Sequence, residues 1–288
     1  MRAAMLGAGV MGRNIARVLA GAGLKVTLYS RSERTLGFAR ATLLDAGVRE
    51  VGFETSVERA VAGAGLVLES VPESLPVKLE VLGLVSGLVA DDAVIASNTS
   101  SLPLSEIAAA VKGPERFLGW HWFNPAHLMP LVEVIPVQAT APGVVEWSLS
   151  LLTSAGKRPT LAPAIDGFLA NRLQYALIRE ALALVDAGLA TPEQVDAAVT
   201  DCLGPRWAVI GPMRSTDLAG VPTALAVAGQ LYPQLSDAGE PQEVLKALIR
   251  EGRLGAAAGQ GFYEYSDPAA AAGERDRLLR AVLDATER

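Results

Sequence analysis

The chain has 288 residues, a length that suits two domains better than one compact core. Half of the residues are hydrophobic and 19% are charged, which excludes intrinsic disorder. The formal net charge of −6 argues against a broad interface with nucleic acid.

Two further features of the composition bear on the compartment of the protein. Cys202 is the only cysteine, so neither an intramolecular disulfide nor a cysteine zinc cluster can form. The apolar first residues are interrupted by glycines and lack the charged segment and cleavage pattern of a signal peptide. We therefore expect a cytoplasmic protein that does not act at a membrane.

The first half of the chain alternates short apolar runs with helical patterns. Strands are predicted at residues 2–6, 25–29, 66–71, 93–97, 116–122 and 131–136. Helices are predicted between the earlier strands, at residues 10–23, 32–47, 77–89 and 105–111. Strands separated in this way imply right-handed crossovers and a largely parallel sheet with helices on both faces. We expect an α/β Rossmann-type N-terminal domain over residues 1–164.

The pattern changes near residue 165, after which long helical stretches predominate. They lie at residues 171–188, 191–204, 223–232, 241–252 and near the C-terminus, with one strand predicted at 261–265. Thr191 followed by Pro192 is typical of a helix start. Residues 165–288 are therefore expected to form a mostly α-helical C-terminal domain.

A glycine-rich motif, G-x-G-x-x-G, directly follows the first predicted strand and opens the first helix. It consists of Gly7, Gly9 and Gly12, with Val10 and Met11 between the last two. In this context the glycines make a tight turn, let a pyrophosphate approach the backbone and let the helix pack on the strand. The motif predicts a dinucleotide site, and the alternative is a glycine turn that binds nothing.

The end of the second predicted strand lacks the carboxylate that NAD sites usually place there. Ser30, Arg31 and Ser32 stand in its place and offer hydroxyl groups and a guanidinium, which suit a ribose 2′-phosphate. This pattern predicts a preference for NADP(H) over NAD(H). The alternative is that Arg31 covers the adenine or extends into solvent.

His121 and His127 are the only histidines, and His121 lies near the carboxyl end of a predicted strand. Doubly wound sheets bind ligands at that edge, and an imidazole suits proton exchange with an alcohol. Glu133 interrupts the next apolar strand, where a carboxylate is costly to bury without a partner. We predict that Glu133 orients His121. The alternative is a histidine bonded to the backbone and a glutamate facing water.

Several sequence blocks, taken together, resemble the L-3-hydroxyacyl-CoA dehydrogenase family. They span about residues 2–265 in the family's order, at positions 71–73 with Lys78, 97–101 (SNTSS), 121–125 (HWFNP), 131–134 (LVEV), 167–172 (GFLANR) and 259–265 (GQGFYEY). The resemblance implies that a 3-hydroxyacyl compound and its 3-keto form are interconverted by hydride transfer with a nicotinamide coenzyme. It also implies a homodimer formed through the helical domain. The chemistry needs one base and one or two oxygen donors, so no metal is expected.

The resemblance also implies roles for individual residues. His121 is the general base, Glu133 is its orienting carboxylate, and Ser100 and Asn171 bond the substrate oxygen. The alternative for Ser100 and Asn171 is ordinary helix capping.

The residues that the resemblance places near the nicotinamide half of the coenzyme are Glu73, Lys78 and Asn98. The three glycines of the motif hold its pyrophosphate.

Two departures from the family pattern bear on the substrate. Members that use CoA thioesters usually carry a long helical hairpin after the second strand, and only residues 33–52 occupy that place here. Residues 204–212 (GPRWAVIGP) resemble the members that oxidise small polar 3-hydroxy acids, such as the gulonate and carnitine dehydrogenase groups. In such a member Arg206 could clamp a carboxylate, and the alternative is a surface ion pair or a charge at a helix end.

The expected function is therefore an NAD(P)-dependent dehydrogenase of an L-3-hydroxyacyl compound of the CoA type. The alternative within this class is a small polar free 3-hydroxy acid. A hypothesis from another class is a non-catalytic NADPH-binding structural protein.

Overall fold

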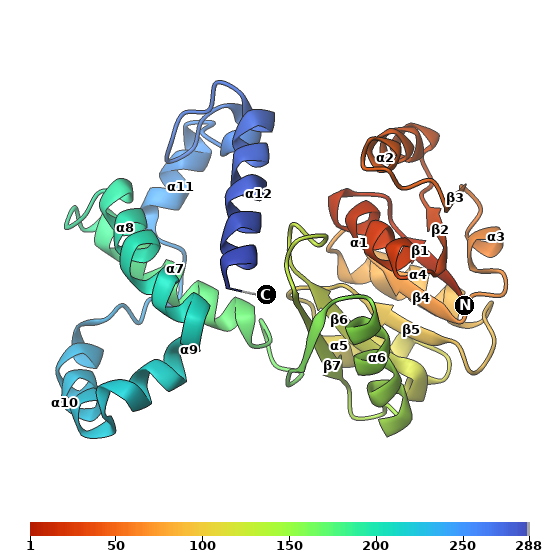
Figure 1. The fold of residues 1–288 in the computed structure, drawn as a ribbon, viewed down its shortest axis with the longest axis horizontal. Helices are drawn as coiled ribbons and strands as arrows, with labels where there is room; N and C mark the ends of the chain where they lie inside the picture. Colours follow the sequence, from red (N-terminus) through yellow and green to blue (C-terminus); the bar gives the residue numbers. More distant parts are fainter. Residues whose placement is uncertain (287–288) are drawn as a thin grey trace. The chain divides into compact units, whose positions relative to one another are not determined.

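The computed structural model describes residues 1–286, and the chain divides into two compact units. The first unit is Met1–Arg172, and the second begins at Leu173. Figure 1 labels the helices and strands of both units. Among the described residues, no helix is both long and apolar enough to cross a membrane.

The first unit is built on an eight-stranded sheet with the strand order β3-β2-β1-β4-β5-β6-β7-β8. All neighbouring strands are parallel except β6 and β7, which are antiparallel. The order reverses between β1 and β4, as in Rossmann-type sheets, which confirms the expected fold class. The strands are β1 Arg2–Leu6, β2 Lys25–Tyr29, β3 Val51–Glu54, β4 Leu66–Glu69, β5 Val94–Ser97, β6 Phe117–Trp122, β7 Leu131–Pro136 and β8 Arg158–Leu161.

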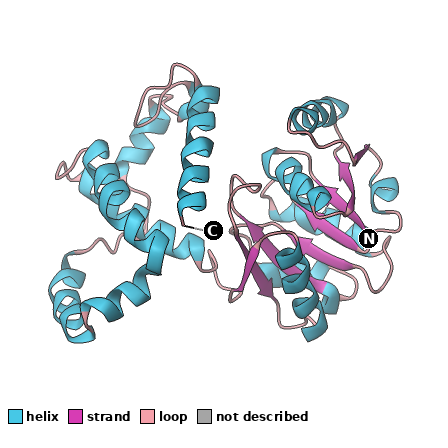
Figure 2. Cartoon of the chain, in the orientation of Figure 1, coloured by secondary structure: helices cyan, strands magenta, loops and turns pink. Residues whose placement is uncertain are grey.

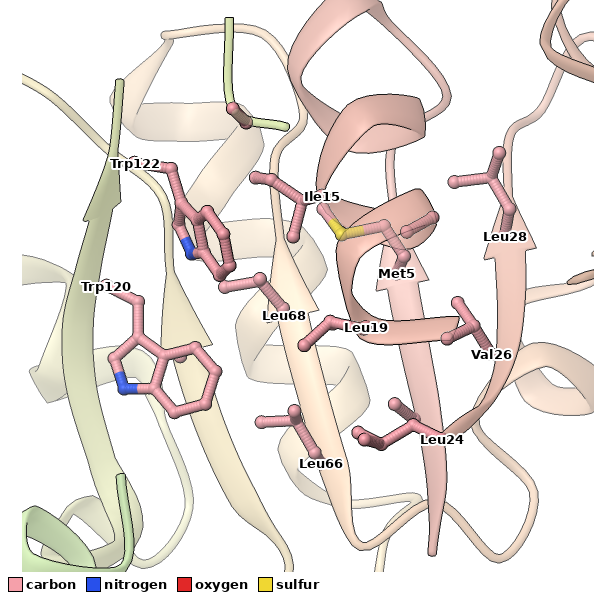
Figure 3. Close-up of a cluster of buried hydrophobic side chains, with 14 of the residues drawn as sticks. Met5, Ile15, Leu19, Leu24, Val26, Leu28, Leu66, Leu68, Trp120 and Trp122 are labelled. Carbon is pink, nitrogen blue, oxygen red and sulfur yellow. The ribbon is translucent and has the colours of Figure 1, made fainter. Parts of the chain in front are cut away.

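Helices cover both faces of this sheet because each presents an apolar stripe to it. Buried residues of α1, α2 and α6 belong to the core on one face, and those of α3, α4 and α5 to the core on the other. Figure 3 shows the first of these cores, in which Ile15 and Leu19 of α1 lie near Trp122 and Leu68. The helices are α1 Val10–Gly21, α2 Glu33–Asp45, α3 Val57–Val61, α4 Leu75–Ser86, α5 Leu104–Ala110 and α6 Pro142–Ser154.

The second unit is mostly helical, as expected, and Figure 2 draws helices and loops there. Thr191 caps α8 in a capping box with Gln194, so the predicted helix start is confirmed. Helix α9 is kinked at Gly211, which precedes Pro212 and has a φ of +68°. Helix α7 begins in the first unit at Ala170. The helices are α7 Ala170–Asp186, α8 Pro192–Ala198, α9 Gly204–Ala219, α10 Val221–Leu231, α11 Glu243–Arg250 and α12 Pro268–Ala285.

One expected strand does not form, two short strands were not expected, and one strand pair of the largely parallel sheet is antiparallel. The strand predicted at residues 261–265 does not form, because this segment folds on itself through isolated bridges at Gln260 and finds no neighbouring strand. The short strands β3 and β8 were not predicted, since β3 has four residues with a central glycine and β8 is a largely exposed edge with Pro159. β7 runs antiparallel to β6 because a loop, without a helix, joins these two strands.

Candidate active site

Each glycine in the turn between β1 and α1 has its own structural reason. Gly7 has a φ of +109°, and a Cβ there would lie 2.3 Å from the carbonyl oxygen of Ser70. A Cβ on Gly12 would lie 1.8 Å from the carbonyl oxygen of Gly7, so only glycine lets α1 pack against the turn. A Cβ on Gly9, by contrast, would meet nothing within 4 Å. The space beside Gly9, at the N-terminus of a 12-residue helix, fits a pyrophosphate.

The chain leaves β2 at Tyr29 and enters α2 at Glu33 through three polar residues. Ser32 caps α2 by accepting a hydrogen bond from the amide of Thr35, and the Ser30 hydroxyl oxygen accepts one from the amide of Ser32. Arg31 is exposed beside them. One edge of the dinucleotide fold therefore carries a guanidinium and two hydroxyl groups.

Glu73 lies after β4 and accepts hydrogen bonds from the loop that follows β5. Its Oε1 atom accepts hydrogen bonds from the Thr99 hydroxyl at 2.6 Å, the Ser100 amide at 2.8 Å and the Ser101 amide at 3.1 Å. Its Oε2 atom lies 3.2 Å from Nζ of Lys78. Partial burial favours the neutral acid, but the hydrogen bonds from Thr99 and Ser100 and the charge of Lys78 outweigh it and lower the pKa of Glu73 to about 2.

Asn98 joins three strands at the same edge of the sheet. Its amide nitrogen donates to the Ser70 hydroxyl after β4, and its amide oxygen accepts from the backbone nitrogen of Trp122 on β6. Because both ends of the side-chain amide are engaged, its orientation is fixed.

His121 and Glu133 face each other across the antiparallel pair of β6 and β7. They are directly opposite in the strand register, and Nδ1 of His121 lies 2.8 Å from Oε2 of Glu133. Both side chains are buried. An imidazole that donates from Nδ1 carries its lone pair on Nε2. The pair therefore sets the histidine tautomer and leaves Nε2 as the nitrogen that can take a proton.

The second carboxylate oxygen of Glu133 bonds to the backbone at the start of α7. Oε1 accepts hydrogen bonds from the amides of Leu169 and Ala170, at the start of α7. Phe168, just before them, adopts a φ of +47°, a left-handed backbone conformation. Burial favours the neutral acid, but the hydrogen bonds from His121, Ala170 and Leu169 outweigh it and lower the pKa of Glu133. The carboxylate is therefore held ionised beside the imidazole.

Two aromatic rings and a lysine restrain the surroundings of His121. The ring centroids of Phe123 and Phe168 lie 4.4 Å and 5.5 Å from that of His121. Nζ of the buried Lys157 donates to the carbonyl oxygens of Ala126 and Met129, in the loop that follows β6. Burial lowers the pKa of Lys157 to about 8. The hydrogen bonds of Lys157 thus hold the loop that contains Phe123.

Ser100 and Asn171 come together from distant parts of the chain. The side-chain nitrogen of Asn171, in the first turn of α7, donates to the backbone oxygen of Ser100 at 3.2 Å. The Ser100 hydroxyl lies 3.3 Å from Oε1 of Glu73. The Asn171 side chain therefore contacts the backbone of Ser100, near the carboxyl end of β5.

Both halves of the chain match models of one protein family. Residues 2–164 match the NAD-binding domain of 3-hydroxyacyl-CoA dehydrogenase, and residues 167–265 match its C-terminal domain. The chain belongs to the 3-hydroxyacyl-CoA dehydrogenase family. This confirms the resemblance found in the sequence blocks and identifies the chain as a nicotinamide-dependent dehydrogenase.

Within the 3-hydroxyacyl-CoA dehydrogenase family, the chain is similar to members with different names. It is 36% identical to 5-formyl-3-hydroxy-2-methylpyridine 4-carboxylate 5-dehydrogenase of Mesorhizobium japonicum, over 97% of this chain and 96% of the relative. It is 34% identical to 3-hydroxybutyryl-CoA dehydrogenase of Mycobacterium tuberculosis, over 92% and 98%. It is 36% identical to L-carnitine dehydrogenase of Streptomyces griseus, over 100% and 90%.

A solved structure extends the likeness to three dimensions. The crystal structure of a 5-formyl-3-hydroxy-2-methylpyridine 4-carboxylic acid 5-dehydrogenase has a TM-score of 0.94 and 35% identity, covering 99% of this chain and 98% of that one. That protein is described as an NAD⁺-dependent dismutase.

Most of the residues singled out in the sequence lie in the first unit of this family member. His121 contacts Glu133, and Asn171 contacts Ser100. Arg206 lies in the second unit on α9, where its guanidinium donates to the backbone oxygen of Cys202 and lies 3.3 Å from its sulfur.

Sequence reasoning missed Glu69, a fully buried carboxylate at the end of β4. The signal that found Glu133, an acid inside an apolar strand, was present at this position too.

Proposed function

We propose that this family member interconverts an L-3-hydroxyacyl compound and its 3-keto form, with His121 as the acid–base group. The observation that carries the proposal is the 2.8 Å contact between Nδ1 of His121 and Oε2 of Glu133, with Glu133 itself held by two backbone amides. An imidazole held in this tautomer suits removal of a hydroxyl proton.

Each residue of the site has a defined part in this mechanism. During oxidation Nε2 of His121 takes the hydroxyl proton, and the negative charge of Glu133 stabilises the imidazolium that results. Ser100 and Asn171 hold the substrate oxygen while its charge changes. A bound nicotinamide coenzyme supplies the hydride acceptor. In the reverse direction the same imidazolium returns the proton to the carbonyl oxygen.

The glycine turn and the β2 edge are proposed to bind the coenzyme. Gly7, Gly9 and Gly12 hold the pyrophosphate at the start of α1, where the open space beside Gly9 supports the assignment. We further propose a preference for NADP(H), supported by the exposed guanidinium of Arg31 and the hydroxyl of Ser30. Glu73, Lys78 and Asn98 are proposed to contact the nicotinamide half of the coenzyme.

The preference is tested by Arg31→Ala. Loss of the guanidinium should weaken NADPH binding about tenfold and leave NADH binding within about twofold, since only the phosphorylated ribose needs it. Fluorescence titration of both coenzymes measures the two constants. An equal loss for both coenzymes would assign Arg31 a packing role, and a wild-type chain that favours NADH tenfold would defeat the preference.

The first substrate class is a 3-hydroxyacyl-CoA thioester. A free 3-hydroxy acid with a second polar group is a second candidate, because only α2 lies between β2 and β3 where CoA-using members usually carry a helical hairpin. Some relatives are named for carnitine and for a pyridine carboxylate, which are free acids. With such a substrate, Arg206 is proposed to bind the carboxylate.

An absorbance assay with each coenzyme separates these functions. The first proposal predicts turnover of acetoacetyl-CoA, and the second predicts turnover of small 3-hydroxy acids with none of CoA esters. Arg206→Ala should then raise KM for the acid about tenfold or more. A chain that turns over neither class would contradict both substrate proposals.

Coenzyme binding is assigned to residues 1–164, and substrate binding and dimer formation to residues 165–288. Large apolar side chains on α9 and α10 support a homodimer through the helical domain, because isolated chains rarely leave so many exposed. These side chains are Val209, Met213, Leu218, Val221 and Leu225, each at least 60% exposed.

A further inference from the structure

The backbone turns sharply just before α7. Gly167 and Phe168 both have a positive φ, of +74° and +47°. Glycine adopts this left-handed region freely, whereas a residue with a Cβ rarely does. Among the residues that the structure describes, Phe168 is the only one other than glycine with a positive φ. The chain therefore accepts an unfavourable backbone conformation at a position that glycine does not occupy.

This turn directs two successive amides to one carboxylate oxygen. The amides of Leu169 and Ala170 lie 3.0 Å and 2.8 Å from Oε1 of Glu133, whose side chain is 1% exposed. Successive amides next to a left-handed residue form a concave site for an anion. The carboxylate of Glu133 occupies that site, so the backbone conformation of Phe168 determines how the carboxylate is held.

The side chain of Phe168 packs beside the imidazole that Glu133 contacts. Phe168 is 3% exposed, and its ring centroid lies 5.5 Å from that of His121. An apolar side chain at this place limits the access of water to the hydrogen bond between Nδ1 of His121 and Oε2 of Glu133, which strengthens that bond. The backbone and the side chain of one residue therefore act on the same pair.

We propose that Phe168 is a positioning residue for the acid–base group. Its left-handed backbone directs the amides of Leu169 and Ala170 to Glu133, and Glu133 then holds His121 in the tautomer with the proton on Nδ1. Phe168 acts on catalysis only through these contacts. The inference rests on the proposed function, since it takes His121 as the group that exchanges the hydroxyl proton.

The test compares two isomeric side chains, in the variants Phe168→Leu and Phe168→Ile. Both remove the aromatic ring and keep an apolar side chain of the same composition. Only isoleucine is β-branched, and this makes a positive φ much less favourable. We expect the leucine variant to keep kcat within about threefold of the wild type, and the isoleucine variant to have a kcat about tenfold or more below that of the leucine variant.

Two NMR measurements without substrate follow the proposed contacts. Hydrogen exchange of the Leu169 and Ala170 amides should be about tenfold or more faster in Phe168→Ile than in Phe168→Leu, while the Val134 amide in β7 changes less than about threefold. The ¹⁵N signals of the neutral imidazole should place the His121 proton on Nδ1 in the leucine variant, and should divide it between Nδ1 and Nε2 in the isoleucine variant. The chain has two histidines, and His121→Ala assigns their signals.

A second pair of variants applies where Phe168→Ile does not fold or exchanges faster throughout. Phe168→Gly and Phe168→Ala both lack the ring, and only glycine adopts the left-handed conformation freely. The glycine variant should keep the slow exchange and the Nδ1 tautomer, and the alanine variant should lose both.

The same exchange at Leu169 and Ala170 and the same His121 tautomer in both members of a pair would overturn the inference. These measurements need no substrate. They therefore decide the inference even for a wild-type chain without turnover, a result that would count against the proposed function alone.

Discussion

The two oxygens of Glu133 bond to different parts of the fold. Oε2 accepts from the imidazole of His121, and Oε1 accepts from the amides of Leu169 and Ala170 where α7 begins. The backbone amides keep the carboxylate ionised and fix its plane, so the side chain can hold the imidazole in one tautomer and orientation. A single residue therefore links the proposed base to the start of a 17-residue helix.

Glu133→Gln tests this link. Glutamine can still accept from the two amides through its oxygen, but it then presents an NH₂ group to Nδ1 of His121 and favours the wrong tautomer. Turnover should fall at least 100-fold, with coenzyme affinity nearly unchanged. Steady-state kinetics and coenzyme titration check both parts, and Glu146→Gln at an exposed position of α6 is the control. Wild-type turnover in Glu133→Gln would refute the role.

The lowered pKa of Glu73 predicts how stability depends on pH. The ordinary glutamate pKa is 4.5 and the folded-state pKa is about 2, so the unfolded chain binds more protons between these values and the folded state gains stability as pH rises. The contribution is complete above about pH 4.5 and is lost as pH falls toward 2. Urea unfolding of wild type and Glu73→Gln should show a difference in unfolding free energy that shrinks over this window. A difference that stays constant between about pH 5 and about pH 2.5 would contradict the lowered pKa of Glu73.

In the turn between β1 and α1, one glycine is needed for folding and another leaves space for the coenzyme. A methyl group on Gly12 would collide with the backbone of Gly7, which ties α1 to β1. The same methyl group on Gly9 would enter open space, where the pyrophosphate is proposed to bind. Two glycines three residues apart thus serve different purposes.

Substitution of each glycine by alanine should give opposite results. Gly9→Ala should keep the wild-type Tm within about 2 °C and weaken coenzyme binding about tenfold or more, because the added methyl group occupies the ligand's space. Gly12→Ala should lower Tm by several degrees or prevent folding, since backbone atoms must move apart. Thermal unfolding and coenzyme titration distinguish the two effects. Equal thermal destabilisation by both substitutions would contradict this account of the turn.

Sequence patterns predicted the elements that carry strong local signals. The glycine turn and the capped start of α8 are local, so the sequence contains all the information they need. The strand predicted at residues 261–265 was wrong because a strand also requires a neighbour, which no local pattern supplies. β8 has a neighbour but only a weak local strand pattern, so it was missed. Its place at the sheet edge comes from pairing with β7.

The same distinction applies to the candidate site. The pairing of His121 with Glu133 was predicted because a scarce histidine lies near the end of one apolar run and a glutamate interrupts the next. The bond between Asn171 and Ser100 joins positions 71 residues apart, and only the folded chain brings them together. The ion pair of Glu69 and Lys78 was not predicted because Lys78 was assigned to the coenzyme by resemblance and Glu69, although it lies in an apolar strand, was not singled out.

At the scale of the whole molecule, the second unit carries little buried apolar surface in a single chain. Leu248 is its one buried hydrophobic residue among those that the structure describes. Tyr263 joins the C-terminal segment to α8 through a 2.7 Å hydrogen bond to Asp196. The exposed apolar side chains of α9 and α10 are therefore the surface through which a second copy is proposed to bind.

The assembly is tested by analytical ultracentrifugation. The wild-type chain should sediment as a dimer, and Met213→Glu/Leu218→Glu should sediment as a monomer, because buried unpaired carboxylates are costly at an interface. Glu80→Gln, at an exposed position of α4, should leave the dimer intact. A double variant that remains dimeric would place the interface on another surface.

The central claim is that the imidazole of His121 exchanges the proton of the substrate hydroxyl as hydride moves to the coenzyme. A single-turnover measurement of hydride transfer in His121→Ala, at saturating coenzyme and substrate, tests it most directly. The rate should be at least 100-fold below that of the wild type, with unchanged coenzyme affinity, because general bases typically contribute this much. Hydride transfer at the wild-type rate would show that His121 is not the base.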